Sequence, residues 1–473
     1  MAIQEPSTAP KVPPEESTKR FVLNSILLSL IEPVRGEPTV YSLDRHPHDN
    51  TSPIAKFLDS FALICSTKSG KDTVSAVCIE QGGPTGTILR LARNTSTSEE
   101  LLLRFQAVLD DLTLIAKGDL GCSLDDKAWE LMSKIVELDR FKIDSIIEIF
   151  QKKRDQELIQ AAVQRLETGE FSNNGDFLEW AGHLPSLLSL SPGTETAELI
   201  KKMHWAAQAR WVYSAHLQRI AFPESTTAPA WINNIYKLGR YHAALLAMIK
   251  LATTRADLFI PIRVELVEPP PQAKFSLNGE SEALRNIIRK CTKAEVEDIE
   301  SQLSVYWLKD ADAHFRKACK ARVLTVHAEM QLACFYDNNM ELTPRFLFMG
   351  TSKKACFHCS TFLCRHERRW SFSATHSKLY PNWMPPLFST GSVRQIHLKL
   401  IWDINQYLEK TIGRELETKL RIPRSKKVVF DSTAGPSLTT FVLGGEFTFI
   451  KPQPQTLTSE PKRITEEEDD SSS

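Results

Sequence analysis

Two pairs of residues constrain the fold of this chain most, because each pair stands where a predicted strand turns into a predicted helix. His327 and Glu329 follow one short strand, and Cys356 and Cys359 follow the next strand after a short polar loop. Two cysteines three residues apart lie on the same side of a helical turn, so both sulfurs can reach one metal ion. The first residue of a helix has non-helical dihedral angles, which allows His327 and Glu329 to face one cleft. The order strand, helix, strand, helix indicates an α/β layer with a buried sheet.

These residue types are typical of a catalytic metal site. His327, Cys356 and Cys359 supply three zinc ligands and leave the fourth tetrahedral position open for water. Zinc lowers the pKa of a bound water to about 7, and the positive ends of two helices favour the thiolate forms of the cysteines. Glu329 lies two residues from a ligand, where it can take the water proton and return it to a leaving nitrogen. The sequence therefore predicts one bound Zn²⁺ and a catalytic carboxylate.

The spacing of these residues also carries a family resemblance. His327-Ala328-Glu329 is followed, 26 residues later, by Cys356-Phe357-His358-Cys359. This arrangement resembles the signature of the zinc-dependent nucleoside and nucleic-acid deaminase superfamily. The runs VHAEMQL, FLFMGTSKKACFHC and ATHSKLYPNWMPP resemble a mainly fungal branch, the OTT-type deaminases. The resemblance covers about residues 320–390 and departs from the wider superfamily at Ala355, where a proline is usual.

The resemblance implies a fold, a reaction and a role for each residue. The fold is the three-layer α/β/α arrangement of a cytidine deaminase-like domain, and the reaction is hydrolytic deamination of a nucleobase. By this analogy His327, Cys356 and Cys359 are the zinc ligands, and Glu329 is the general acid and base. Cytosine, adenine and guanine all remain candidates for the base.

The length of the chain predicts more than one domain, because 473 residues exceed what one ordinary hydrophobic core supports. Residues 1–19 are rich in proline, serine and glutamate and are expected to form a disordered tail, as is most of the segment 424–473, which ends in an acidic run. Residues 20–255 are predicted to form a mainly helical domain, and residues 258–423 the deaminase-like domain. Three prolines at 269–271 mark the connection. A core shared by the two halves is the alternative.

The N-terminal region carries helical signals and one hairpin. Thr97 and Glu100 have the spacing of a capping box, and the apolar run that follows ends at Gly118. Two strands, 74–80 and 85–93, are joined by a Gln-Gly-Gly-Pro turn and predict a β-hairpin. Three roles stay open for this region: positioning the substrate, binding a partner, or covering the site.

The composition of the chain limits which binding partners and which cellular compartment can be expected. The chain has 58 basic and 58 acidic residues, so its overall charge favours neither nucleic acid nor a membrane, although a local basic surface is compatible with this balance. Nine cysteines with one tight cluster favour a reducing compartment over a secreted disulfide scaffold. The first residues lack the features of a signal peptide, and no apolar run is long enough to span a bilayer. We therefore expect a soluble intracellular protein, cytoplasmic or nuclear, without a membrane partner and with no indicated oligomeric state.

A loop from His376 to Pro386 is the candidate wall of a substrate cleft. Tyr380 or Trp383 could stack on a base, while His376 or Lys378 could reach a phosphate or an exocyclic group. The alternative is that Trp383 and the prolines cover the edge of the core.

Basic residues around the two cysteines suggest a second contact with substrate. Lys353 and Lys354 precede Cys356, and three arginines follow Cys359 at positions 365, 368 and 369. These side chains are either a footprint for a phosphate backbone or a solvated helix face.

Three classes of function therefore compete. The first is a zinc-dependent hydrolytic deaminase of a nucleobase, either in a nucleoside or nucleotide or in single-stranded RNA or DNA. The second is a catalytically inactive binding module with the deaminase fold and a structural zinc ion. The third is a closed zinc module in which Cys364 and His366 join Cys356 and Cys359. We favour the first class, with a slight preference for single-stranded nucleic acid as substrate.

Overall fold

The computed structural model describes residues 16–45, 52–70, 72–83, 86–119, 121–167, 174–221, 228–277, 282–386 and 391–419. These residues form many helices and two small sheets, so the predicted mixture of helix and strand is confirmed at that level. The predicted C-terminal tail lies outside the described residues. The predicted N-terminal tail overlaps the first helix, which begins at Glu16.

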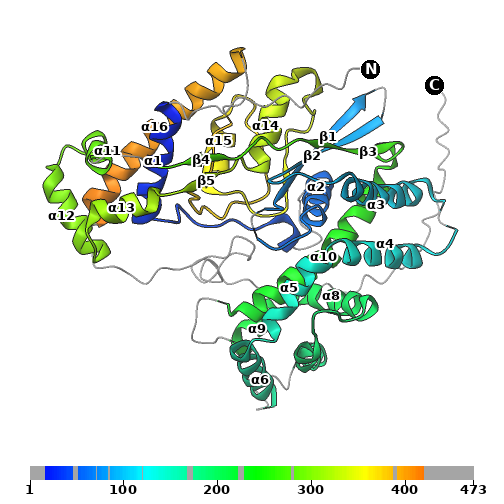
Figure 1. Cartoon of the computed structure of the whole chain (residues 1–473). Coiled ribbons are helices and arrows are strands. Elements are labelled where there is room, and N and C mark those ends of the chain that lie inside the picture. Colours follow the sequence, from blue (N-terminus) through cyan, green and yellow to red (C-terminus); the bar gives the residue numbers. More distant parts are fainter. Residues whose placement is uncertain are drawn as a thin grey trace, which may run out of the picture.

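One four-stranded sheet lies at the centre of the structure (Figure 1). Its strands are β1 (Ser75–Gly83), β2 (Gly86–Arg93), β3 (Ile262–Val267) and β6 (Gly350–Thr351), in the order β3-β2-β1-β6. β1 pairs antiparallel with β2 and with β6, whereas β2 and β3 are parallel. The predicted hairpin is thus confirmed, and it supplies the two inner strands of the sheet.

The hairpin is buried on both faces because its apolar residues alternate between two cores. Val77 and Ile79 belong to one hydrophobic cluster, and Ala76 and Cys78 belong to the other. Helices α2 (Pro53–Ile64) and α3 (Glu99–Lys117) contribute to the first cluster, and α14 (Ala328–Asn338) contributes to the second.

Helix α2 approaches β6 closely enough to require glycine there. A Cβ atom at Gly350 would lie 2.2 Å from the backbone carbonyl carbon of Leu58 in α2, which is far inside van der Waals contact. Glycine at this position therefore allows α2 to pack directly on the strand that leads to the two cysteines.

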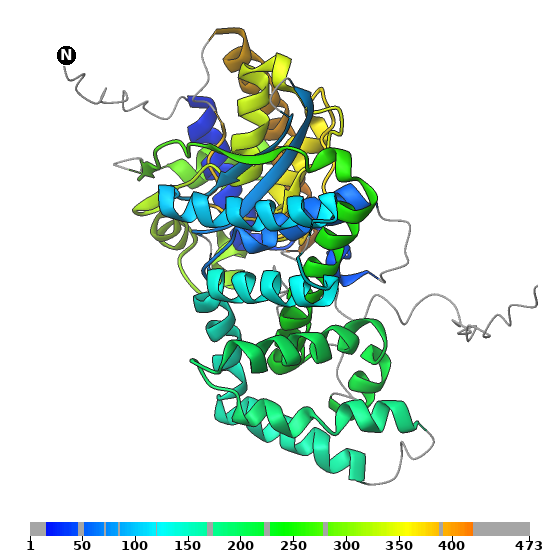
Figure 2. The same cartoon turned by 90° about the vertical axis from the view of Figure 1, so that its right-hand side faces the viewer.

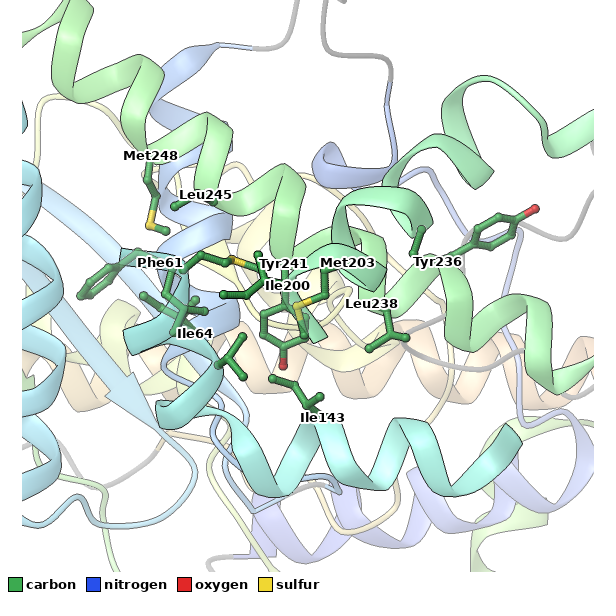
Figure 3. Packing of buried hydrophobic residues seen from close by; sticks show 14 of the residues in the cluster. Phe61, Ile64, Ile143, Ile200, Met203, Tyr236, Leu238, Tyr241, Leu245 and Met248 are labelled. Atoms are coloured by element: carbon green, nitrogen blue, oxygen red, sulfur yellow. The ribbon is translucent and has the colours of Figure 1, made fainter. Parts of the chain in front are cut away.

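A helical region follows the hairpin and extends away from the sheet (Figure 2). Its long helix α10 (Ala230–Thr254) packs against α8 (Thr196–Trp211) and α2. Figure 3 shows Tyr241 of α10 among Ile143, Ile200 and Met203, and its hydroxyl donates to the buried Asp139 at 2.8 Å. The other helices of this region are α4 (Leu124–Leu138), α5 (Arg140–Phe150), α6 (Lys153–Glu167), α7 (Gly175–Ala181), α8 (Thr196–Trp211) and α9 (Ser214–Ala221).

Helices from the two ends of the chain pack together. In Figure 1, α1 (Glu16–Ile31, blue) lies along α16 (Gly391–Lys419, orange). Arg20 of α1 donates to both carboxylate oxygens of Glu409 in α16 at 2.5 Å, and Asn24 donates to the same carboxylate at 3.2 Å.

The remaining elements surround the second cluster. A two-stranded antiparallel sheet pairs β4 (Ala273–Phe275) with β5 (Arg322–Leu324). The helices here are α11 (Ala283–Cys291), α12 (Val296–Trp307), α13 (Ala311–Cys319) and α15 (Phe357–Arg365). No helix in the described ranges is both long and apolar enough to cross a membrane.

The central sheet crosses the predicted boundary between residues 255 and 258. β2 lies before that boundary and β3 lies after it, yet the two strands pair in parallel along six residues of each. α1 also packs on α16 across it. This arrangement corresponds to the shared core that the sequence left as an alternative.

We expect the fragment 258–423 to be insoluble, or soluble without cooperative unfolding, when it is produced alone. It lacks β1, which separates β2 from β6, and it would expose the apolar face of α14 that packs on the hairpin. Solubility and denaturant unfolding should be compared with those of the fragment 16–423. A soluble 258–423 fragment that unfolds cooperatively would show that the hairpin is dispensable for this core.

Candidate metal centre and active site

The structure places the two predicted pairs at helix starts that face each other. His327 immediately precedes α14 with φ −70° and ψ 153°, and Cys356 immediately precedes α15 with φ −78° and ψ 168°. These extended dihedral angles are those expected of N-cap residues. The Cys356 sulfur accepts a hydrogen bond from the backbone N–H of Cys359 at 3.4 Å. Local capping therefore holds the Cys356 sulfur at the positive end of α15.

The three predicted ligands converge on one point. His327 Nδ1 lies 3.4 Å from Cys359 Sγ and 3.6 Å from Cys356 Sγ. Ligands at ordinary Zn–S and Zn–N bond lengths, arranged tetrahedrally, would place nitrogen and sulfur about 3.6 Å apart. The donor set and its spacing therefore fit a zinc ion bound by one imidazole and two thiolates.

The two thiols share one environment and differ in acidity. Burial raises the pKa of Cys356, but hydrogen bonding from Cys359 and the charge of His327 together hold that pKa well below its usual range. Burial raises the pKa of Cys359, and the neighbouring Cys356 thiolate raises it further. The pKa of Cys356 is therefore the lower of the two.

Glu329 lies in the first turn of α14 beside the ligands. Its side chain is buried, and its Oε2 atom has no hydrogen-bond partner among the described residues. Burial raises the pKa of Glu329, opposed by the charge of His327. A buried carboxylate with an unused oxygen and a raised pKa has the properties of a general acid and base.

Glu329, His327 and Cys356 line one pocket of about 240 Å³. Its other walls come from elements far apart in the sequence: the end of β2, the connection that precedes β4, β5, the loop after β6, and the segment 376–382. This pocket is therefore the place where a substrate could reach the candidate metal.

Three of the five residues predicted to contact substrate line this pocket: Lys353, His376 and Tyr380. The Tyr380 ring lies edge-on to the His327 ring, with 5.9 Å between their centroids. Lys353 donates to the backbone carbonyl of Gly70. The neighbouring Lys354, predicted as part of a basic surface, is buried and also lines the pocket.

His376 presents a defined hydrogen-bond donor. Its Nδ1 accepts from the backbone N–H of Lys378 at 3.0 Å, so the ring proton is on Nε2. Burial lowers the pKa of His376 to about 4, which makes the imidazole neutral at neutral pH. Within the described part of the chain, Lys378 does not line this pocket.

Trp383 lies beneath the cysteines rather than on the pocket wall. Its ring is buried against Phe21 and His358, and its indole N–H donates to Cys359 Sγ at 3.3 Å. This placement matches the alternative in which Trp383 covers the core, and it adds a hydrogen bond to a candidate ligand.

Several residues of the pocket lie outside the motifs and the loop predicted from the sequence, among them Asn94, Gln272 and Arg322. Asn94 follows β2, and its Oδ1 accepts from the backbone N–H of Ala328 at 2.9 Å, which fixes the start of α14. The only sequence signal for Asn94 was its position at the end of the predicted hairpin, more than 200 residues before the motif.

A second group of potential metal ligands lies at the other end of α14. Asp337, His366 and His397 bring their ligand atoms within 4.8 Å of one another. The Asp337 carboxylate accepts from His366 Nε2 at 2.9 Å, from His397 Nε2 at 2.7 Å, and from Arg368 Nη1 at 2.6 Å. One carboxylate thus joins α14, the end of α15 and α16.

The directions of these hydrogen bonds indicate a cluster held together by hydrogen bonds rather than a metal site. His366 Nδ1 accepts from the backbone N–H of Arg368 at 3.3 Å, so its Nε2 carries the proton and has no lone pair for a metal. The Arg368 guanidinium already neutralises the Asp337 carboxylate. Since His366 bonds Asp337 and Cys364 is exposed, neither completes a closed site with the two cysteines.

Comparisons with known proteins support the chemistry suggested by this geometry. Residues 326–387 match the model of a family described as OTT_1508-like deaminases. The matched segment contains all three candidate ligands, Glu329 and the loop that includes His376 and Tyr380. No curated protein and no solved structure matches the chain. The segment is thus similar to a deaminase family.

We expect the purified protein to contain one zinc ion per chain, and the variants His327→Ala and Cys356→Ser to lose it. Elemental analysis measures this directly. The control is Cys364→Ser, which removes an exposed thiol near the end of α15 and should keep full zinc content. Full occupancy in either ligand variant, or zinc loss in the control, would contradict the assignment.

Stability should depend on the ionised form of Asp337. Burial raises the pKa of Asp337, but hydrogen bonds from His366 and His397 outweigh this effect and hold that pKa at about 2. A depressed pKa stabilises the fold above the unfolded value of 3.8, and the contribution is lost as pH falls toward 2. The shift corresponds to roughly 2 kcal/mol of unfolding free energy.

The variant Asp337→Asn should therefore be less stable than the parent protein at about pH 6, with a smaller difference at about pH 3. Denaturant unfolding at both pH values measures this. Asp403→Asn, which changes an exposed carboxylate on α16, serves as the control. A difference that stays constant with pH would show that ionisation of Asp337 is not what stabilises the cluster.

Proposed function

We propose that this protein is a zinc-dependent hydrolytic deaminase that acts on a nucleobase. The observation that carries the proposal is the joint position of His327, Cys356, Cys359 and Glu329, with the unused oxygen of Glu329 buried beside the ligand atoms. The family match over residues 326–387 supports the same reaction class. The cytidine deaminase-like three-layer fold and the mainly fungal branch are part of this proposal.

The residues of the pocket divide the chemistry among them. Zinc held by the three ligands supplies the Lewis acidity that makes water nucleophilic near neutral pH. Glu329 accepts a proton from the attacking water and delivers it to the amino nitrogen as the C–N bond breaks, so that ammonia leaves and a carbonyl remains. His376, a neutral donor through Nε2, is suited to hold an acceptor atom of the base.

The substrate form we favour is a nucleobase in single-stranded nucleic acid, with a nucleoside or nucleotide as the other candidate. The ring of Tyr380 provides a surface for a base, and Lys353 places positive charge at the pocket. All nine cysteines are free thiols, which suits a reducing, intracellular compartment in the cytoplasm or nucleus.

Replacement of Glu329 by Gln should abolish the reaction without removing the metal. The amide keeps the size of the side chain but cannot accept the water proton, so ammonia release should fall by at least about 10²-fold. Zinc content and the unfolding transition should stay close to those of the parent protein. Glu367→Gln, at an exposed position shortly after α15, is the control and should retain activity.

Substrates for this assay should include nucleosides, nucleotides, RNA and single-stranded DNA. Full activity of Glu329→Gln would remove Glu329 from the mechanism. Zinc-loaded parent protein that releases no ammonia from any of these substrates would favour the inactive binding module instead.

A further inference from the structure

One cation of the pocket, Arg322, precedes a candidate metal ligand by only five residues. Arg322 begins β5, and the chain continues through Thr325 to His327. Both Arg322 and His327 line the pocket. Five residues of extended chain span at most about 17 Å, so the Cα atoms of Arg322 and His327 are no farther apart than this.

The guanidinium of Arg322 is held in place by uncharged groups. Its Nε donates to the backbone carbonyl of Ala318, and its Nη1 donates to Asn382 Oδ1 at 3.0 Å. No carboxylate within the described ranges forms an ion pair with Arg322, whereas Arg285, Arg316 and Arg368 in the same half of the chain each have one. Arg322 is therefore oriented in advance and keeps its full positive charge.

The side chains around Arg322 leave hydrogen-bond donors facing the pocket. Because Asn382 directs Oδ1 to Arg322, its NH2 group remains available to donate. Thr325 Oγ1 accepts from Gln272 Nε2 at 3.3 Å, which leaves its hydroxyl proton to donate. Arg322 Nη2 forms no hydrogen bond to the residues described. Arg322, Asn382 and Thr325 thus form a wall with donors and one uncompensated positive charge.

We infer that Arg322, Asn382 and Thr325 form a subsite for a phosphate group of the substrate. Phosphate oxygens only accept hydrogen bonds and carry negative charge, and a planar guanidinium matches them in geometry. His327, Cys356 and Glu329 line the same pocket. A base beside these residues and a phosphate beside Arg322 could therefore belong to one bound molecule. This inference rests on the proposed function and makes the substrate a phosphorylated nucleoside, either a free nucleotide or a residue in a polynucleotide.

The test compares nucleoside, nucleoside monophosphate and short single-stranded oligonucleotide on the zinc-loaded full chain. Calorimetry measures binding independently of turnover. The parent protein should bind the phosphorylated ligands about 10- to 100-fold more tightly than the nucleoside, as charge-assisted hydrogen bonds predict. Arg322→Gln should bring this ratio toward one, and its effect on deamination should be a raised KM for the phosphorylated substrates.

Two further variants separate binding from folding. Asn382→Asp keeps the acceptor for Arg322 but replaces a donor by a carboxylate oxygen, so it should strengthen that contact and still abolish the preference for phosphate. A purely structural role of this contact would leave the preference intact in Asn382→Asp. Lys320→Gln removes an exposed charge two residues from Arg322 and should keep the ratio of the parent protein.

The outcomes distinguish this inference from the proposed function. A parent protein that binds nucleoside and nucleotide equally, or an unchanged ratio in Arg322→Gln and Asn382→Asp, overturns the phosphate subsite even if ammonia is released. Arg322-dependent binding of phosphate ligands without any ammonia release supports the subsite and overturns the deaminase. A preference for the oligonucleotide alone identifies the phosphate as that of a polymer, and an equal preference for the monophosphate identifies a nucleotide.

Discussion

Strand β1 pairs with β2 on one side and with β6 on the other, and the candidate metal centre depends on both pairings. Asn94 follows β2, and its side chain accepts from the first amide of α14 and so fixes His327 and Glu329. β6 runs into the short loop that ends at Cys356. Because the two helix starts are positioned from β2 and β6, which β1 joins in one sheet, three ligand atoms can meet although they come from segments almost 30 residues apart. A shift of either strand would separate the imidazole from the sulfurs.

The predictions that succeeded were those that depend on local geometry. The spacing of two cysteines over one helical turn and the dihedral angles of an N-cap are properties of a few adjacent residues, so the meeting of His327, Cys356 and Cys359 could be expected from the sequence. The place of the hairpin in the sheet could not, because the parallel pairing of β2 with β3 joins segments more than 160 residues apart. Arg322 was missed for the same reason: its significance comes from its contact with Asn382 and from the lack of an ion pair to it among the described residues. The sequence does not determine whether an aromatic side chain in a loop faces a cleft or the core. Trp383 faces the core.

The two ends of α14 show how buried polar groups differ between a site and a support. At its last turn, Asp337 accepts hydrogen bonds from two histidines and an arginine, so its charge is satisfied by protein atoms. At its first turn, Glu329 is more deeply buried than Asp337 and keeps an oxygen without a partner in the described structure. An unsatisfied buried carboxylate costs stability, and a fold tolerates this cost where a ligand or reactant supplies the missing contact. The satisfied cluster at Asp337 holds α14 against α15 and α16, which keeps the unsatisfied end in position.

One of the connections between the helical region and this site runs through a segment near the N-terminus. Arg240 of α10 forms a buried ion pair with Asp44 at 2.6 Å, and this fixes the segment that contains Thr39 and Tyr41. Tyr41 donates its hydroxyl proton to the backbone carbonyl of Thr351 at the end of β6, and the backbone N–H of Thr39 donates to the carbonyl of Thr375 at 2.9 Å. Thr351 precedes the lysine loop of the pocket and Thr375 precedes His376, so both pocket walls are tied to α10 through these few contacts. The helices between the hairpin and β3 therefore act on the site as a support for its walls, because a movement of α10 would be transmitted to the two segments that position the cysteines and His376.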